Sequence, residues 1–278
     1  MISRVIGALI RAVLVVLLIA APSMLLQDVS RDTAQIVTLI ALFGAGLTFF
    51  EYCSSYPGLI EFRDAPPFNR IRYASLLITI VLLSFTISET PSVVRDVVAP
   101  WAAVVGDLID FPYSPVRLVV LMLPADATIE HVLKVRNSAG MAYAISLITL
   151  VTFAILQRVR NWPIQRGSFN VWINLPTFDP TAGGDVVERL ERDARFNIAL
   201  GFLLPFLTPA VIKSANSLFG AVTLENPQTL IWTVAAWAFL PASLFMRGIA
   251  MGRIAAMITQ KRKESNEENG GNAGLLPV

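Results

Sequence analysis

The side chains that usually carry out chemistry are scarce in this sequence. It has one cysteine, Cys53, and one histidine, His131, among 278 residues. Metal and haem centres need clustered thiolates, imidazoles or carboxylates, so centres built from several Cys or His residues are excluded. A catalytic Cys/His pair needs the two side chains within hydrogen-bond reach, whereas the apolar segment between them predicts that they lie on opposite sides of a membrane. We therefore expect no metal and no other cofactor.

Ionisable residues in or beside apolar segments are the next candidates, because a charge inside a membrane is costly and usually functional. Only three qualify: Arg11, Glu51 and Lys213. Each is close enough to the end of its segment to reach the interface. Lys213 differs from the others because Pro205 and Pro209 interrupt the segment before it and Asn216 follows. Lys213 and Asn216 are the candidate intramembrane polar site; the simpler alternative is a kinked helix whose lysine reaches outward.

Carboxylates at the membrane surface would suit an enzyme that acts on lipid. Glu51, Glu61 and Asp64 are close together in the sequence, and such an enzyme needs a titratable cluster of this kind. The sequence has no nucleotide-binding loop, no hydrolase elbow, no zinc-binding helix motif and no paired intramembrane carboxylates. We therefore expect no enzymatic activity.

Long apolar blocks must position these residues. Charged residues make up 15% of the chain, against about 25% in soluble proteins, and the mean hydropathy is +0.63. A membrane-crossing helix needs about 20 mostly apolar residues. Six windows without charge approach this length: 12–27, 33–50, 73–88, 137–157, 196–212 and 226–246. The sequence thus predicts an all-α polytopic membrane protein with six transmembrane helices, not a nucleic-acid-binding protein.

The basic residues predict how the helices are oriented. If the N-terminus is cytoplasmic, 16 of the 22 Lys and Arg residues lie on the inner side and six on the outer side. This bias is the one that normally orients membrane proteins, so we predict both termini in the cytoplasm and the inner (plasma) membrane of a bacterial cell. The first helix, extended to Val5–Leu26, also resembles a secretory signal. Because Ala21-Pro22-Ser23 is a poor cleavage context, we expect the helix to be retained.

The predicted helices divide the chain into four parts. These are residues 1–88 with three helices and an inner loop at 51–72, an extracytoplasmic interfacial segment at 89–139, residues 140–253 with three helices and a cytoplasmic loop at 158–195, and a disordered cytoplasmic tail at 254–278. The tail is predicted from its Ser, Asn, Glu and Gly content.

The outer segment predicts helices at the membrane interface. Pro100–Ile109 would form one, with its proline in the first turn and Trp101 near the lipid headgroups. Val116–Leu123 is short and would dip into the membrane or pack on a partner. A further helix would begin with Asp126 as its cap and run through Val135.

The inner loop predicts a strand followed by a charged helix. Apolar side chains alternate in the segment after Phe169; the candidate partner-contact residues are Phe169, Val171, Trp172, Ile173 and Leu175. A lone strand is unstable, so it would pair with Leu59–Arg63, with Trp162–Gln165 or with another protein. Asp185 would cap the helix that follows, whose narrow apolar stripe would rest on the membrane or the strand.

Small residues recur one helical turn apart, as in Ala41 with Ala45 and Ala238 with Ala242. Such pairs let helices approach closely, either within one bundle or between subunits. Together with the interfacial helices, the unpaired strand and the lack of buried polar groups, they favour a non-catalytic integral membrane subunit, scaffold or assembly factor of an inner-membrane complex. Its partners would be the lipid bilayer and another protein or a second copy. The alternative is a small-solute or ion transporter or channel that uses the Pro-interrupted fifth helix.

Overall fold

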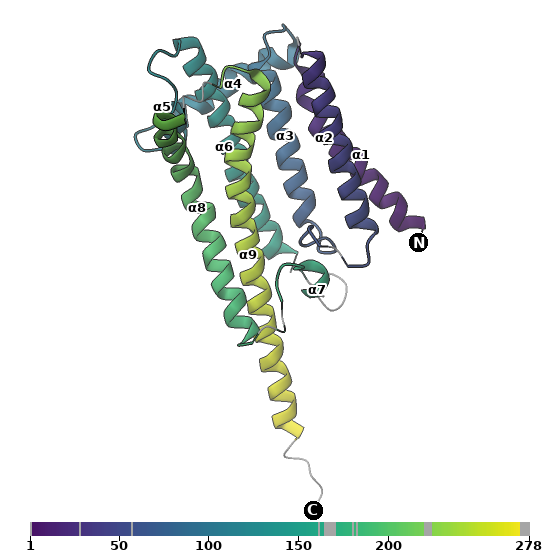
Figure 1. Cartoon of the computed structure of the whole chain (residues 1–278). Helices are drawn as coiled ribbons and strands as arrows, with labels where there is room; N and C mark the ends of the chain where they lie inside the picture. Colours follow the sequence, from purple (N-terminus) through teal and green to yellow (C-terminus); the bar gives the residue numbers. More distant parts are fainter. Residues whose placement is uncertain are drawn as a thin grey trace, which may run out of the picture.

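The computed structural model describes residues 2–27, 29–56, 58–160, 162–163, 171–179, 181, 183–219 and 224–272, and every regular element within them is a helix (Figure 1). The helices are α1 (Ile2–Leu25), α2 (Arg31–Cys53), α3 (Phe68–Ile87), α4 (Val93–Ile109), α5 (Pro115–Leu121), α6 (Ile129–Val159), α7 (Val171–Asn174), α8 (Val186–Phe219) and α9 (Pro227–Asn272).

Six of these helices are long and apolar enough to cross a membrane: α1, α2, α3, α6, α8 and α9. The predicted all-α, multi-pass membrane protein is thereby confirmed. The spanning helices alternate in direction, so the start of α1 and the end of α9 lie at the same end of the bundle, which we call the near end (Figure 1). The opposite end, which carries α4 and α5, is the far end. The assignment of the near end to the cytoplasm stays a prediction.

The bundle is organised around α9. This helix packs against α8, α6 and α3 and touches α1, and half of its most apolar stretch is buried inside the protein. At the periphery, α2 packs on α1 and on no other helix of the described part of the chain. Only 6% of the apolar stretch of α2 is buried. Most of its surface therefore faces whatever surrounds the bundle.

Glycines mark the points where helices approach most closely. A Cβ at Gly140 on α6 would lie 2.5 Å from the Cα of Gly106 on α4. Likewise, a Cβ at Gly201 on α8 would lie 2.7 Å from the carbonyl oxygen of Pro241, and one at Gly248 on α9 would lie 2.7 Å from that of Ala194. None of these positions has room for a side chain, so glycine sets the spacing of both helix pairs.

The outer segment differs from its prediction in two respects. The helix α4 begins at Val93, seven residues before Pro100, because the side chain of Ser92 accepts the backbone N–H of Arg95 and caps it. The helix α6 begins at Ile129, where Thr128 rather than Asp126 is the cap, and it runs without a break into the predicted span. A charge-free window ends at the first charged residue of such a helix, whereas the helical backbone hydrogen bonds continue through the charged turns.

Two segments of the near end, the predicted charged helix after Asp185 and the predicted disordered tail, prove to be parts of longer helices. The charged helix after Asp185 and the fifth span form one continuous helix, α8, whose stripe Val187, Leu190 and Ala194 is buried in a cluster with α9. It therefore rests on neither the membrane nor a strand. The predicted disordered tail at 254–278 is wrong for 254–272, which continue α9, while 273–278 lie outside the described residues.

The predicted strand at 169–175 is wrong in its described part. Val171–Asn174 form a single helical turn, and Leu175 after it is fully buried; Phe169 and the side chains of Val171 and Trp172 lie outside the described part. The loop expected as its strand partner does meet this segment, at Asn174. Asn174 accepts the backbone N–H of Phe62 at 2.7 Å with its carbonyl, and that of Asp64 at 3.1 Å with its side chain. Hydrogen bonds to this one asparagine stand here in place of the backbone hydrogen-bond ladder of a β-sheet.

Gly140 offers a direct test of the α4–α6 contact. We expect Gly140→Ala to lower the free energy of unfolding by about 1–3 kcal/mol, because the new methyl group has no space. Gly46→Ala on α2 is the matched control, since no atom of the described residues lies within 4 Å of its added Cβ. That change should be neutral or stabilising by up to about 1 kcal/mol, as for Gly to Ala within a helix. Unfolding in detergent measures both, and equal stability of the two variants would contradict the close contact.

Candidate functional site

An aromatic cluster closes the near end of the bundle. Phe62, Phe68, Phe153 and Trp162 are each at most 1% exposed, and their ring centroids lie 4.4 to 6.4 Å apart. The indole N–H of Trp162 donates to the carbonyl of Ala65 at 3.0 Å. The loop between α2 and α3 is thereby held under the bundle. Such a cluster stabilises chiefly by burying apolar area.

The shortest ion pair of the described residues lies beside this cluster. Arg247 on α9 donates to both carboxylate oxygens of Glu61, at 2.6 and 2.9 Å, and the Thr177 hydroxyl donates to the same carboxylate at 2.7 Å. The side chains of Glu61 and Arg247 are 14% and 24% exposed. This bidentate pair is among the stronger polar interactions in proteins, and it links the loop after α2, the loop after α7 and the central helix.

The other two carboxylates that the sequence offered as candidates, Glu51 and Asp64, are also engaged within the chain. Glu51 accepts the backbone N–H groups of Gly58, Leu59 and Ile60 at 3.0 to 3.1 Å. Asp64 pairs with Arg63 at 3.3 Å. Arg63 also donates to the carbonyl of Glu51 at 2.8 Å. All three candidate carboxylates therefore stabilise the loop between α2 and α3. None of them lines either of the two pockets found between helices.

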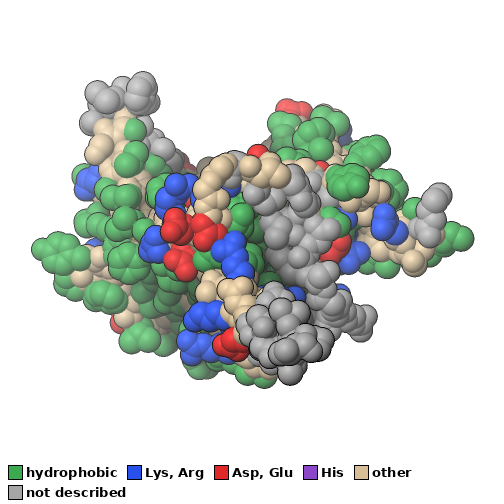
Figure 2. Space-filling view, turned by 90° about the horizontal axis from the view of Figure 1, so that it is seen from below, with side chains coloured by type: hydrophobic (Ala, Val, Ile, Leu, Met, Phe, Trp, Pro, Cys, Tyr) green, Lys and Arg blue, Asp and Glu red, His purple; other side chains and the backbone are tan. Residues whose placement is uncertain are grey.

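An ion pair between Asp185 and Arg262 joins the near-end start of α8 to the C-terminal extension of α9. The Asp185 carboxylate accepts the backbone N–H of Val187 at 3.0 Å and a guanidinium N–H of Arg262 at 2.9 Å. These two contacts hold the pKa of Asp185 below its ordinary value. The contribution of these contacts to the free energy of unfolding is present at neutral pH and is lost as the pH falls through that lowered pKa. Figure 2 looks onto this end, where acidic and basic side chains gather at the centre between apolar flanks.

Arg72 is a charged residue that the sequence prediction missed, because it lies one position before a charge-free window. Its guanidinium lies over the rings of Phe68 and Phe239, at 5.5 and 5.7 Å from their centroids. Its Nη1 donates to Asn69 at 3.4 Å. The aromatic faces give a buried cation part of the stabilisation that a carboxylate would otherwise supply. A Phe four residues before the Arg on one helix is the signal that could have revealed it.

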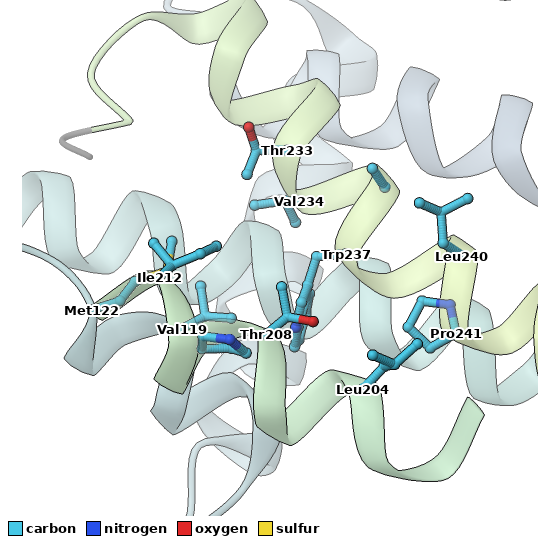
Figure 3. A pocket seen from close by; sticks show the side chains of 12 residues that line it. Val119, Met122, Leu204, Thr208, Ile212, Thr233, Val234, Trp237, Leu240 and Pro241 are labelled. Carbon is cyan, nitrogen blue, oxygen red and sulfur yellow. The ribbon is translucent and has the colours of Figure 1, made fainter. Parts of the chain in front are cut away.

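A different kind of site lies in the far half, between α5, α8 and α9. A cleft of about 270 Å³ is lined by Val119, Met122, Leu204, Thr208, Pro209, Ile212, Thr233, Val234, Ala236, Trp237, Leu240 and Pro241 (Figure 3). Pro209 has no N–H, so the carbonyl of Pro205 one turn earlier lacks its helical donor. The indole N–H of Trp237 donates to that carbonyl at 3.1 Å instead. Both prolines thus lie within the continuous helix α8, and the carbonyl that Pro209 leaves without a donor is satisfied by α9.

A second cavity, of about 230 Å³, lies between α1 and α2. It is lined by Val16, Ala20, Ser23, Met24, Ala34, Val37, Thr38, Ala41 and Leu42. Like the first, it includes no acidic or basic residue. Neither cavity has the titratable groups that acid–base chemistry needs.

The residues expected to do chemistry are dispersed. Cys53 ends α2 at the near end and His131 begins α6 at the far end (Figure 1). Lys213 is exposed on α8, one turn beyond Pro209, and the side chain of Asn216 lies outside the described part of the chain. Arg11 donates to the carbonyl of Gly7 at 2.7 Å and lies over the Tyr52 ring. In the described residues, no three His, Cys, Asp or Glu side chains come together as a possible metal site.

Comparison with known proteins gives no relative. No protein-family model, no curated protein and no solved structure matches the chain.

The Glu61–Arg247 pair can be tested by removing one charge while keeping the shape. We expect Glu61→Gln to lower the free energy of unfolding by about 1–2 kcal/mol, because it leaves a largely buried guanidinium without its counter-charge; the partial exposure keeps the loss below that of a fully buried pair. Arg192→Gln is the control, since Arg192 is 73% exposed and should change stability by less than about 0.5 kcal/mol. Equal losses in the two variants would show that the pair is not structural.

Proposed function

We propose that this chain is a non-catalytic integral membrane subunit, scaffold or assembly factor of an inner-membrane protein complex, and that it contacts its partner through α2. The partner is a transmembrane helix of another protein or of a second copy. The observation that carries the proposal is an exposed seam on α2, formed by Leu39, Phe43, Gly46 and Phe50.

The seam has the spacing of a helix-packing surface. Its residues are separated by four, three and four positions, which places them on one face of a helix. Leu39, Phe43 and Phe50 are 68%, 69% and 72% exposed. Gly46 lies between the two phenylalanines and is surrounded by open space. Large side chains that flank a glycine form a notch into which a second helix can pack.

Gly46 contrasts with its neighbour Gly44. A Cβ at Gly44 would lie 3.1 Å from Ile19 and 3.3 Å from Val15 of α1, so that glycine serves the packing of α1 against α2. Ala41 is also buried there, so these small residues act within the bundle. No described atom lies within 4 Å of a Cβ built at Gly46, although glycine lowers helix stability by about 1 kcal/mol relative to alanine. A helix outside the chain would account for it.

The near end supports a structural rather than a catalytic role. There Glu51 binds backbone N–H groups, and Glu61 and Asp185 pair with arginines, contacts that stabilise the loops and helix ends. The excess of basic residues at this end favours its location in the cytoplasm. A bacterial inner membrane remains the location that this charge bias favours.

Blocking the notch tests the proposal. We expect Gly46→Leu to weaken assembly at least about ten-fold, which corresponds to about 1.4 kcal/mol of lost helix packing, and to leave the unfolding of the chain itself unchanged. Native gels and native mass spectrometry after gentle extraction measure the assembly. Val211→Leu is the control, because Val211 is 65% exposed on α8, far from α2. A monomer at every protein concentration, or full assembly by Gly46→Leu, would refute the proposal.

The alternative function is transport of a small solute or ion along α8. It is favoured by the cleft beside Pro209, although the apolar lining suits an apolar solute better than an ion. If α8 forms the pathway, Lys213→Met and Asn216→Ala should each lower flux into proteoliposomes more than about ten-fold, since a charged or polar group in a pathway is costly to replace. Lys261→Met, at the other end of the molecule, is the control. Normal flux in both α8 variants would exclude this placement.

A further inference from the structure

We propose that the cleft between α5, α8 and α9 is a binding site for one anionic phospholipid, whose acyl chain fills the cleft and whose phosphate binds Lys213. The site is separate from the α2 seam and does not depend on the proposed scaffold function.

The cleft results from how α8 and α9 diverge. The two helices are in close contact at Gly201 and Gly248, where no side chain fits between them. Farther along, the lining positions of α8 run from Leu204 to Ile212, which is roughly 12 Å of helix. Over this distance the helices separate (Figure 1), and α5 covers the gap with Val119 and Met122 (Figure 3).

The lining selects for hydrocarbon. Only Thr208 and Thr233 bring hydroxyl groups, and the one indole donor, on Trp237, is engaged by the Pro205 carbonyl. A polar solute would therefore lose its hydration without gaining matching hydrogen bonds. The cleft also reaches the surface of a spanning segment, because its lining residue Leu240 is 57% exposed. Lipid acyl chains are the hydrocarbon that surrounds such a segment.

The size of the cleft fits part of a lipid. Its volume of about 270 Å³ is slightly below the range of roughly 300–1,000 Å³ for sites that enclose a whole small molecule. A single chain can lie in it while the rest of the lipid stays in the bilayer.

Lys213 supplies the contact for the headgroup. It lies four residues after Pro209, hence on the same face of α8 and one turn nearer the far end, and its side chain is exposed. Because a spanning bundle meets lipid headgroups at each of its two ends, a lysine nearer the far end than the cleft is placed to reach a headgroup there. A lysine above an apolar cleft therefore offers an acyl chain and a phosphate complementary surfaces at once.

Native mass spectrometry tests the site on the full chain reconstituted in equal amounts of phosphatidylglycerol and phosphatidylcholine. We expect the wild type to retain one phospholipid and to prefer phosphatidylglycerol. Thr208→Phe fills the cleft and should lower lipid retention at least about five-fold, whereas Val211→Phe, the same kind of change outside the cleft, should not. Lys213→Gln should retain lipid, but its preference for phosphatidylglycerol over phosphatidylcholine should fall about five-fold, which is the effect of one lysine near an anionic headgroup.

Several outcomes would overturn the proposal. These are equal lipid retention by Thr208→Phe and the wild type, an unchanged headgroup preference in Lys213→Gln, and a retained molecule that has no phosphate or is a second protein chain. Thr233→Phe fills the same space from α9 and replaces Thr208→Phe if that variant unfolds. Because Gly46 lies on α2, Gly46→Leu should keep its lipid, so a failure of the scaffold proposal and a failure of the lipid site are distinguishable.

Discussion

The contact between α8 and α9 at two glycines is the constraint on which much of the structure depends. At Gly201 and Gly248 the backbones are too close for any side chain, so the two helices are held at a fixed point. On the near side of this point, α8 lays its stripe Val187, Leu190 and Ala194 on α9. On the far side, the helices diverge and leave the cleft. One close contact therefore produces a dry cluster at one end and an open groove at the other.

A second constraint is that backbone groups inside hydrocarbon must be hydrogen-bonded within the protein. Pro209 leaves the Pro205 carbonyl without its helical donor, and the indole of Trp237 fills that role. The interaction ties α8 to α9 a second time, beside the glycine contact. At the near end, where water is close, the same requirement is met by charged side chains, as Glu51 binds three successive N–H groups of the following loop. The prolines thus shape the helix pair without breaking a helix.

The sequence predicted the spanning helices well, because apolar length is a local property. It failed where tertiary contacts decide: Asn174 caps the loop at Phe62 and Asp64, and the alternating pattern around it folds as a helical turn. The Glu61–Arg247 pair joins residues 186 positions apart, which no local pattern indicates. Lys213 was identified from its setting among prolines, but the cleft below it needs three separate helices. Gly248 and Gly252 form a small-residue motif that sequence reasoning could have found.

The surfaces proposed for function lie on opposite sides of the bundle. In Figure 1, the pair of α1 and α2 is at one edge and α8 at the other, with α9 between them. A helix packed on the α2 seam would therefore not compete with a lipid in the cleft. The two sites also differ in mechanical support. Among the helices of the described residues, α2 packs on α1 alone, whereas α8 is fixed to α9 by the glycine contact and by Trp237. A partner on α2 would bind a helix that has room to adjust its position. A lipid beside α8 would bind a groove whose walls are already held in place, which lowers the entropic cost of filling it.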